Sequence, residues 1–335
     1  MNSEDMDAID SKKIYQTYDK WPEIAKQSYD NNFEKLDVKN IDHVVFAGMG
    51  GSGSIGDVIS AILSKDDIHV SNVKGYHLPK TVDSNSLIIT TSVSGNTIET
   101  LTVLENAQKT NAKIAAFSSG GIMKNFCEKN NIFYKEIPMQ HSPRGSFTRY
   151  LFSMLNILQE IIPIQKMDIN ESISALEKTS SDISSKNLTE KNTSLRLAKW
   201  VKKIPLIYYP WGLQSVAIRF KNSLQENSKS HAMTEDIIET CHNGIVPWEK
   251  NLNVHPILIR GNDDYIKTIE RWDILKQFFT EKEIDYFEIK SISGNILAKI
   301  TNLIYLLDYA SIYHAILNQI DPSPVDPIDF IKKRV

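Results

Sequence analysis

The feature that most constrains the fold is a repeated alternation of short apolar strands with helical patterns. In the first half, β-branched or apolar runs predict strands at 43–47, 68–73, 86–91, 113–117 and 132–137. In the second half the predicted strands are 204–209, 255–259 and 285–289, and the predicted helices are 213–224, 265–279 and 296–317. This alternation predicts parallel βαβ units. We therefore expect an α/β protein with two doubly wound domains, each a parallel sheet flanked by helices.

The length of 335 residues also suits two domains better than one core. An apolar helix predicted at 151–162 closes the first domain. After Pro163 the chain is rich in Ser, Lys, Glu and Asn, with apolar residues at helical spacing. The prediction is an N-terminal domain at 1–162, a helical connector at 163–190 and a C-terminal domain at 191–335.

The composition excludes several classes of partner. Hydrophobic residues make up 41% and charged residues 24%, which is a globular balance, and the net charge of -3 draws the chain neither to nucleic acid nor to anionic membrane. No apolar run is long enough to span a bilayer, and the polar, acidic start is not a secretory signal. Two cysteines and eight histidines show no metal-ligand spacing. We expect a cytoplasmic protein without a metal.

The turn from Ser92 to Thr97 has the composition of a phosphate site. It follows a predicted strand and opens a predicted helix, where free backbone N–H groups and the helix dipole favour an anion. Ser92, Ser94 and Thr97 add hydroxyl donors, and Gly95 allows close approach of the backbone. Ser/Thr/Asn residues also commonly cap helices, so capping is the alternative.

A glycine cluster after the first strand gives a second candidate. Gly48 to Gly53 fits the dinucleotide pattern G-x-G-x-x-G, which also needs an acidic residue at the end of the second strand. Asp66 and Asp67 precede that strand, so an NAD-linked enzyme ranks below phosphate binding. Gly51 and Ser52, near the tip of the loop, are then expected to join the same phosphate site.

A short internal echo follows a later strand. Residues 291–296 (SISGNI) resemble 92–97 (SVSGNT), and both open a predicted helix. Two copies of one α/β unit would explain the match. The second copy leads into a very apolar helix, so we assign it a packing role.

Three motifs together resemble a known family. The segments 48–55 (GMGGSGSI), 92–97 (SVSGNT) and 242–249 (HNGIVPWE) occur in the order typical of bifunctional phosphoglucose/phosphomannose isomerases, and the segment 306–325 resembles that family's ending. Those enzymes have two domains of the sugar-isomerase (SIS) fold. The resemblance implies a homodimer acting on glucose, mannose and fructose 6-phosphates through an enediol, without metal or cofactor. Gly244 and Pro247 depart from the family pattern and put the local loop geometry in question.

The resemblance also implies the catalytic residues. Glu226 matches the base that moves the proton between C2 and C1, and His242, 16 residues later, matches the ring-opening acid/base. In the family this histidine comes from the partner subunit. Glu235 and Glu239 compete with Glu226 by proximity.

Two cations complete the implied set. Arg144 matches the arginine near the enediolate, with Arg149 as the alternative. Lys332 matches a C-terminal lysine that helps to open the ring, with Lys333 as the alternative. A non-catalytic sugar-phosphate sensor would keep the cradle without this set, but no basic helix-turn-helix segment accompanies it here.

Overall fold

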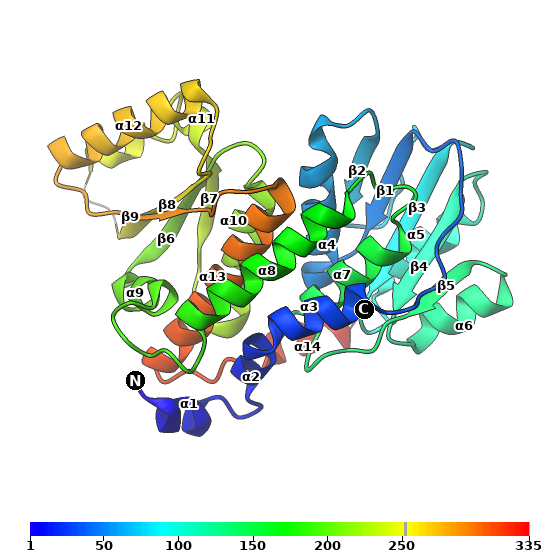
Figure 1. Cartoon of the computed structure of the whole chain (residues 1–335), viewed down its shortest axis with the longest axis horizontal. Coiled ribbons are helices and arrows are strands. Elements are labelled where there is room, and N and C mark those ends of the chain that lie inside the picture. Colours follow the sequence, from blue (N-terminus) through cyan, green and yellow to red (C-terminus); the bar gives the residue numbers. More distant parts are fainter. Residues whose placement is uncertain (251–252, 335) are drawn as a thin grey trace. The chain divides into compact units, whose positions relative to one another are not determined.

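The computed structural model describes residues 1–250 and 253–334. The chain divides into two compact units (Figure 1). The first unit comprises Lys20–Lys166 together with the residues from Ile331 onward. The second unit comprises Met1–Asp19 and Met167–Phe330. The division into domains 1–162, 163–190 and 191–335 stays a prediction.

The first unit is built on sheet A, whose five parallel strands have the order β2-β1-β3-β4-β5. The strands are β1 (His43–Ala47), β2 (His69–Val73), β3 (Ser86–Ser92), β4 (Lys113–Ser118) and β5 (Phe133–Glu136). Each lies within one residue of its predicted bounds. β1 and β3 are buried along their whole length, because central parallel strands are covered on both faces.

Helices cover both faces of sheet A (Figure 1). They are α3 (Trp21–Tyr29), α4 (Gly50–Ile62), α5 (Ile98–Ala107), α6 (Gly121–Lys129) and α7 (Phe147–Ile157), with the short η1 (Leu63–Lys65) after α4. On one face Leu104 of α5 clusters with Met123 and Cys127 of α6. α7 packs against α3 and α4, and Trp21 stacks on Phe147 with ring centroids 5.9 Å apart.

Two predicted helices begin earlier than expected. The apolar spacing of residues 54–63 predicts a helix there, but α4 begins already at Gly50, because tertiary packing overrides the poor helix propensity of its glycines. α7 spans Phe147–Ile157 rather than 151–162. The apolar run continues into a turn in which Ile161 and Ile162 are still buried, so hydrophobicity alone misplaced the helix end.

The second unit contains sheet B, with four parallel strands in the order β7-β6-β8-β9. They are β6 (Ile204–Tyr209), β7 (Met233–Asp236), β8 (Val254–Arg260) and β9 (Phe287–Lys290). The prediction missed β7. This edge strand reads Met-Thr-Glu-Asp and is only partly buried, so it carries no apolar run.

The helices of the second unit are α8 (Lys166–Ile183), α9 (Thr193–Trp200), α10 (Gln214–Asn227), α11 (Ile237–Thr240), η2 (Val246–Glu249), α12 (Ile266–Glu281) and α13 (Ile296–Leu317), with α1 (Ser3–Ile9), α2 (Ile14–Asp19) and α14 (Asp326–Lys332) near the termini. In this unit, α10 contacts β6 and β7, and α11 contacts β7. α13 contacts α2, α9 and α10. Because neighbours enclose it, α13 is buried along almost its whole length, including polar residues such as Asp308.

The first four strands of the two sheets follow the same order, but the internal echo does not occupy equivalent places. The turn at 92–97 follows the third strand of sheet A, and the turn at 291–296 follows the fourth strand of sheet B. Asn295 caps α13 by accepting from the Ala298 N–H at 2.9 Å, and its amide donates to the Asp168 carbonyl at 3.0 Å. The second turn therefore joins α13 to α8, which agrees with a packing role.

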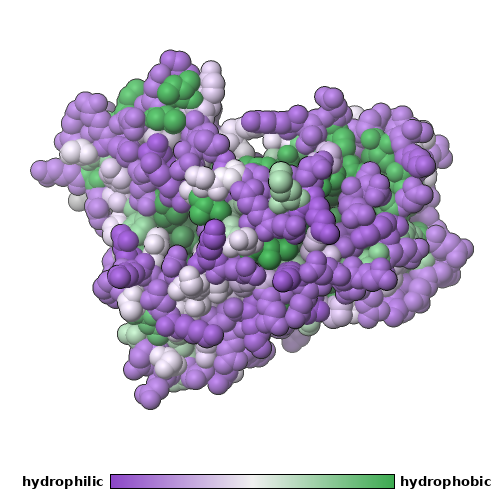
Figure 2. Space-filling model, viewed as in Figure 1, coloured by the Kyte–Doolittle hydropathy of each residue, from purple (hydrophilic) through white to green (hydrophobic). Residues whose placement is uncertain are grey.

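The visible face is mainly hydrophilic, with separate apolar patches (Figure 2). One patch lies over α11 and α12, and Ile266 and Ile274 are exposed on α12. In the described part of the chain, no helix combines the length and the apolar character needed to cross a membrane.

Candidate active site

The turn from Ser92 to Thr97 lies at the carboxyl end of β3 and leads into α5. The Ser92 and Thr97 hydroxyls are 2.9 Å apart, and the Gly95 N–H donates to the Ser92 hydroxyl at 3.1 Å. Thr97 occupies the N-cap of α5 but makes no side-chain cap bond. Ser94 and Thr97 are half-buried. The turn thus presents hydroxyls beside a helix N-terminus that its own N-cap side chain does not satisfy, which suits an anion.

Gly95 is fixed in this turn by a neighbouring glycine pair. Its φ is +71°, and a Cβ there would lie 1.8 Å from the Gly120 carbonyl oxygen. Asn96 accepts from the Ile122 N–H at 2.9 Å, which joins the turn to the start of α6. Residues 118–121 (SSGG) were given no role from the sequence, although their position after a predicted strand was a usable signal.

The loop from β1 into α4 adjoins the same turn. The Ser52 hydroxyl is buried and accepts from the Val93 N–H at 3.2 Å. A Cβ on Gly51 would lie 3.2 Å from the Cα of Arg144, so this glycine lets α4 approach the backbone ahead of α7. Sheet A therefore brings the predicted residues Gly51, Ser52 and Arg144 close to one another at its carboxyl edge.

The dinucleotide alternative lacks its acidic residue. β2 ends at Val73, and the next residue is Lys74, which pairs with Asp57 of α4 at 2.6 Å. Burial raises the pKa of Asp57, while the Lys74 charge opposes that effect. A cation at this place does not fit the hydrogen bond to a ribose hydroxyl that the fingerprint needs.

The two candidate arginines lie on either side of the start of α7. Arg144 precedes the helix and is 5% exposed. Arg149 lies within the helix and is half-buried, and its Nε atom is buried with no hydrogen-bond partner in the described structure. Arg144 lies against the glycine-rich loop through its backbone contact with Gly51.

In the second unit, Glu226 and His242 lie toward opposite edges of sheet B. Glu226 is in the last turn of α10, which runs back from the carboxyl end of β6 toward the amino edge. β7 then returns to the carboxyl edge, where α11 ends just before His242. A helix that connects parallel strands runs against them, so the two side chains are separated by the depth of the sheet. Within one chain, the second unit therefore does not bring Glu226 and His242 together.

The competing glutamates lie near the His242 turn instead. Glu239 accepts from the Asn243 amide at 2.6 Å. Burial raises the pKa of Glu235, and a Cβ on Gly244 would lie 2.2 Å from a carboxylate oxygen of that residue. Gly244 thus makes room for Glu235.

The second departure from the family pattern also has a local fit. Pro247 lies in the first turn of η2, where its missing N–H costs nothing. Trp248 follows and donates to the Tyr208 hydroxyl at 2.8 Å from a buried position. Trp248 is therefore part of the core. Lys332 ends α14 and Lys333 follows it; both are exposed, so the choice between them still depends on the resemblance.

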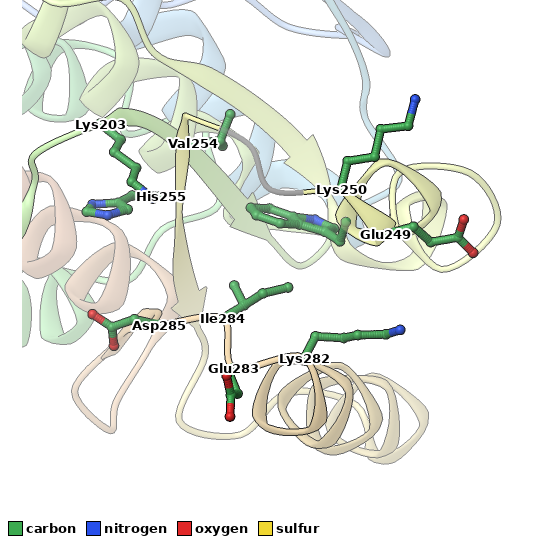
Figure 3. Close-up of a pocket in the computed structure, with 10 residues that line it drawn as sticks. Lys203, Glu249, Lys250, Val254, His255, Lys282, Glu283, Ile284 and Asp285 are labelled. Atoms are coloured by element: carbon green, nitrogen blue, oxygen red, sulfur yellow. The ribbon is translucent and has the colours of Figure 1, made fainter.

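A cavity of about 430 Å³ lies at the amino edge of sheet B (Figure 3). Trp248 and Val254 contribute to its wall, and Lys203, His255 and Asp285 lie at its strand ends. The Lys250 and Lys282 side chains extend away from each other rather than toward one point (Figure 3). None of the predicted site residues lines it, and ligands in open α/β sheets bind at the carboxyl edge. Within residues 1–250 and 253–334, no three His, Cys, Asp or Glu side chains are grouped to hold a metal ion.

Solved structures establish the fold class. A hypothetical protein from Thermus thermophilus superposes with a TM-score of 0.74 at 13% identity, covering 98% of this chain and 92% of that one. The C-terminal domain of glucosamine-fructose-6-phosphate aminotransferase from Francisella tularensis gives 0.66 at 14% identity, covering 91% and 96%. Residues 190–335 match the bacterial phospho-glucose isomerase C-terminal SIS domain. The predicted class of two parallel-sheet SIS domains is confirmed.

Sequence relatives establish the family. A bifunctional phosphoglucose/phosphomannose isomerase of Caldicellulosiruptor bescii is 33% identical over 94% of this chain and 96% of its own length. One from Thermoplasma acidophilum is 31% identical over 92% and 93%. The chain belongs to the bifunctional phosphoglucose/phosphomannose isomerase family, a family of isomerases.

Proposed function

We propose that this enzyme interconverts glucose 6-phosphate and mannose 6-phosphate with fructose 6-phosphate through a cis-enediol. The observation that carries the proposal is the hydroxyl-lined turn at Ser92–Thr97, joined to the Gly51–Ser52 loop, in a chain of this family. Three hydroxyls and a helix N-terminus suit the several oxygens of a phosphate monoester.

The first unit supplies the phosphate site and the enediolate partner. Gly51, Ser52, Ser92, Ser94 and Thr97 bind the phosphate. Arg144 faces the developing enediolate, because a fixed guanidinium charge stabilises an oxyanion without a proton transfer.

The second unit supplies the proton chemistry. Glu226 moves the proton between C2 and C1, and rotation about C2–C3 of the planar enediolate accounts for two epimeric products. His242 and Lys332 assist ring opening. The separation of Glu226 from His242 across sheet B favours a homodimer in which His242 of the partner subunit completes the site. We expect the dimer to act in the cytoplasm.

The test is turnover of fructose 6-phosphate with EDTA present, scoring glucose 6-phosphate and mannose 6-phosphate separately. Wild type should form both products, and Glu226→Gln should lose each by about 10²- to 10⁴-fold, the usual contribution of a positioned base. Glu235→Gln and Glu239→Gln are matched controls and should stay active. One product alone would refute dual specificity, and binding without turnover would favour the sensor.

A second experiment addresses the shared site. Glu226→Gln and His242→Gln subunits should each be inactive alone. When the two are co-expressed, mixed dimers would contain one site with both intact residues, so part of the activity should return. No recovery from dimers shown to be mixed would place both residues of each site on one chain.

A further inference from the structure

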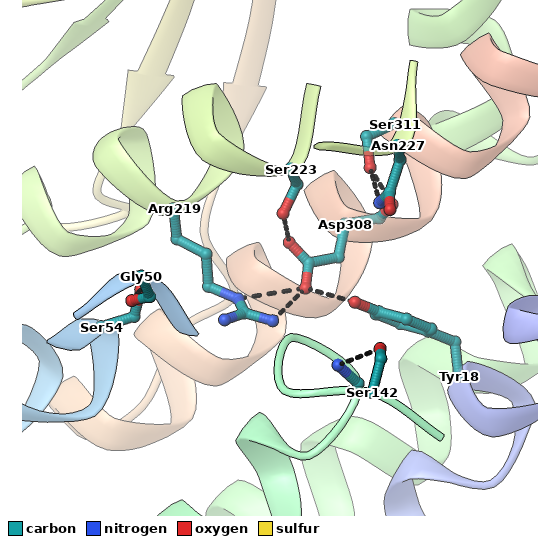
Figure 4. Close-up of polar contacts among 10 residues, drawn as sticks. Tyr18, Gly50, Ser54, Ser142, Arg219, Ser223, Asn227, Asp308 and Ser311 are labelled. Carbon is teal, nitrogen blue, oxygen red and sulfur yellow. Dashed lines mark hydrogen bonds and ion pairs between the residues drawn. The ribbon is translucent and has the colours of Figure 1, made fainter. Parts of the chain in front are cut away.

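The helix that carries Glu226 is held on α13 by a stripe of polar contacts (Figure 4). Arg219 donates to one carboxylate oxygen of Asp308 from Nε at 3.0 Å and from Nη2 at 2.6 Å. Ser223 donates to the other oxygen at 2.7 Å, and Asn227 donates to the Ser311 hydroxyl at 2.8 Å. These three α10 residues are spaced by four, so they lie on one side of the helix. The stripe therefore fixes the rotation of α10 about its axis.

An ammonium group also contacts the end of α10. Lys229 Nζ lies 2.8 Å from the carbonyl oxygen of Glu226 itself and 3.2 Å from that of Asn227. The same atom lies 2.9 Å from the Asp321 carbonyl oxygen and 3.3 Å from that of Pro322. The backbone of Lys229 has a φ of +53°, which reverses the chain just after the helix.

This arrangement matches the chemistry of a helix C-terminus. The last carbonyl groups of a helix have no N–H partners within it, and the helix dipole favours a cation there. The ammonium satisfies two of these carbonyls and, through Asp321 and Pro322, also binds the segment that leads into α14. Lys229 is thus the cross-link between the turn that carries Glu226 and the C-terminal segment that ends near Lys332.

We propose that Lys229 is a positioning residue for Glu226, an inference that rests on the proposed role of Glu226 as the base. The asparagine and serine contacts orient α10 from one side, and Lys229 holds the Glu226 backbone at its end. Loss of the ammonium removes this donor from the Glu226 and Asn227 carbonyls and loosens the last turn, which moves the Glu226 carboxylate relative to the substrate carbons. Lys229 touches no substrate atom in this role.

The test compares Lys229→Met with Lys191→Met, a matched control in an exposed loop of the same unit. Methionine keeps an unbranched side chain and faces the same positive φ as the lysine it replaces, so the variant adds little backbone strain of its own. We expect kcat to fall by about tenfold or more, since misplacement of a catalytic group by roughly 1 Å can cost about 10²-fold. KM should stay near its wild-type value, and Lys229→Arg should recover part of the rate.

The kinetic isotope effect separates positioning from simple destabilisation. With glucose 6-phosphate deuterated at C2, Lys229→Met should show a larger isotope effect than wild type, because proton transfer becomes slower relative to the other steps. If Lys229→Met does not fold, Lys229→Gln, which keeps one amide donor, answers the same question. An unchanged kcat and isotope effect in a folded variant, or a rise in KM alone, would overturn the proposal. Inactive wild type, or an active Glu226→Gln, would instead overturn the proposed function.

Discussion

Replacing Asp308 by Asn should destabilise the second unit by about 3–5 kcal/mol, the usual cost of removing one partner of a buried ion pair. Arg219 is 3% exposed and Asp308 is fully buried, so water cannot take over the lost charge. The Asp308 carboxylate accepts from Arg219 twice, from Tyr18 at 3.0 Å and from Ser223 at 2.7 Å. Asparagine keeps the shape but leaves the guanidinium without its buried counter-charge.

Urea unfolding followed by tryptophan fluorescence can report this loss selectively. Four of the five tryptophans belong to the second unit, namely Trp200, Trp211, Trp248 and Trp272. The midpoint should fall at an unchanged slope if only stability changes. Glu270→Gln is the matched control, because its pair with Lys267 joins side chains that are 50% and 68% exposed. Such a surface pair contributes about 0–1 kcal/mol.

A double variant tests the cause. Arg219→Met together with Asp308→Leu removes both charges, and apolar replacement of a buried pair is often neutral or stabilising. It should therefore recover much of the stability that Asp308→Asn loses. If Asp308→Asn costs no more than the surface control, the argument from buried charge is wrong.

Three further predictions follow from local geometry. Gly95→Ala should raise the KM for fructose 6-phosphate by about tenfold, as steady-state kinetics can measure. The left-handed backbone alone costs an alanine roughly 1–2 kcal/mol, and its Cβ would also clash with Gly120. Burial lowers the pKa of His314, so the stability that it contributes is complete above about pH 6.5 and is lost as the pH falls toward the folded pKa. The urea unfolding midpoint should therefore drop in acid, and it should drop less in His314→Gln. Burial raises the pKa of Cys127 to about 12, so iodoacetamide should modify the partly exposed Cys241 first, as judged by peptide mass spectrometry.

The strands of sheet A could be predicted because each is a separate apolar run between polar turns. Val44 and Ile88 lie in runs whose every residue is buried, which is the pattern that central parallel strands require. β7 was not predicted, because an edge strand does not need a fully buried apolar run. The N-terminal helix α1 was also missed, since it has a single buried residue, Met6, and so shows no clear apolar stripe.

The internal contacts of the proposed phosphate turn could be predicted for a related reason. Its Ser92 and Thr97 contact lies within six residues, so strand, turn chemistry and helix start can all be seen in one short segment. Ser52 is different, because its bond to Val93 joins residues 41 apart. The sequence indicates that Ser52 belongs to a suitable loop, but only the parallel pairing of β1 with β3 brings the two loops together.

The orientation of Glu226 is harder to predict from sequence patterns, because the groups that would orient it are remote in the chain. Arg219 meets Asp308 across 89 residues, and Lys229 meets Asp321 across 92. Lys229 follows α10 and is exposed, and no sequence pattern distinguishes it from other exposed lysines. Its place is decided by the positive φ that turns it back on the helix and by the segment that α13 delivers to the same point. A family motif can therefore suggest which glutamate is the base, whereas what holds that base in place follows only from the packing of α10 on α13.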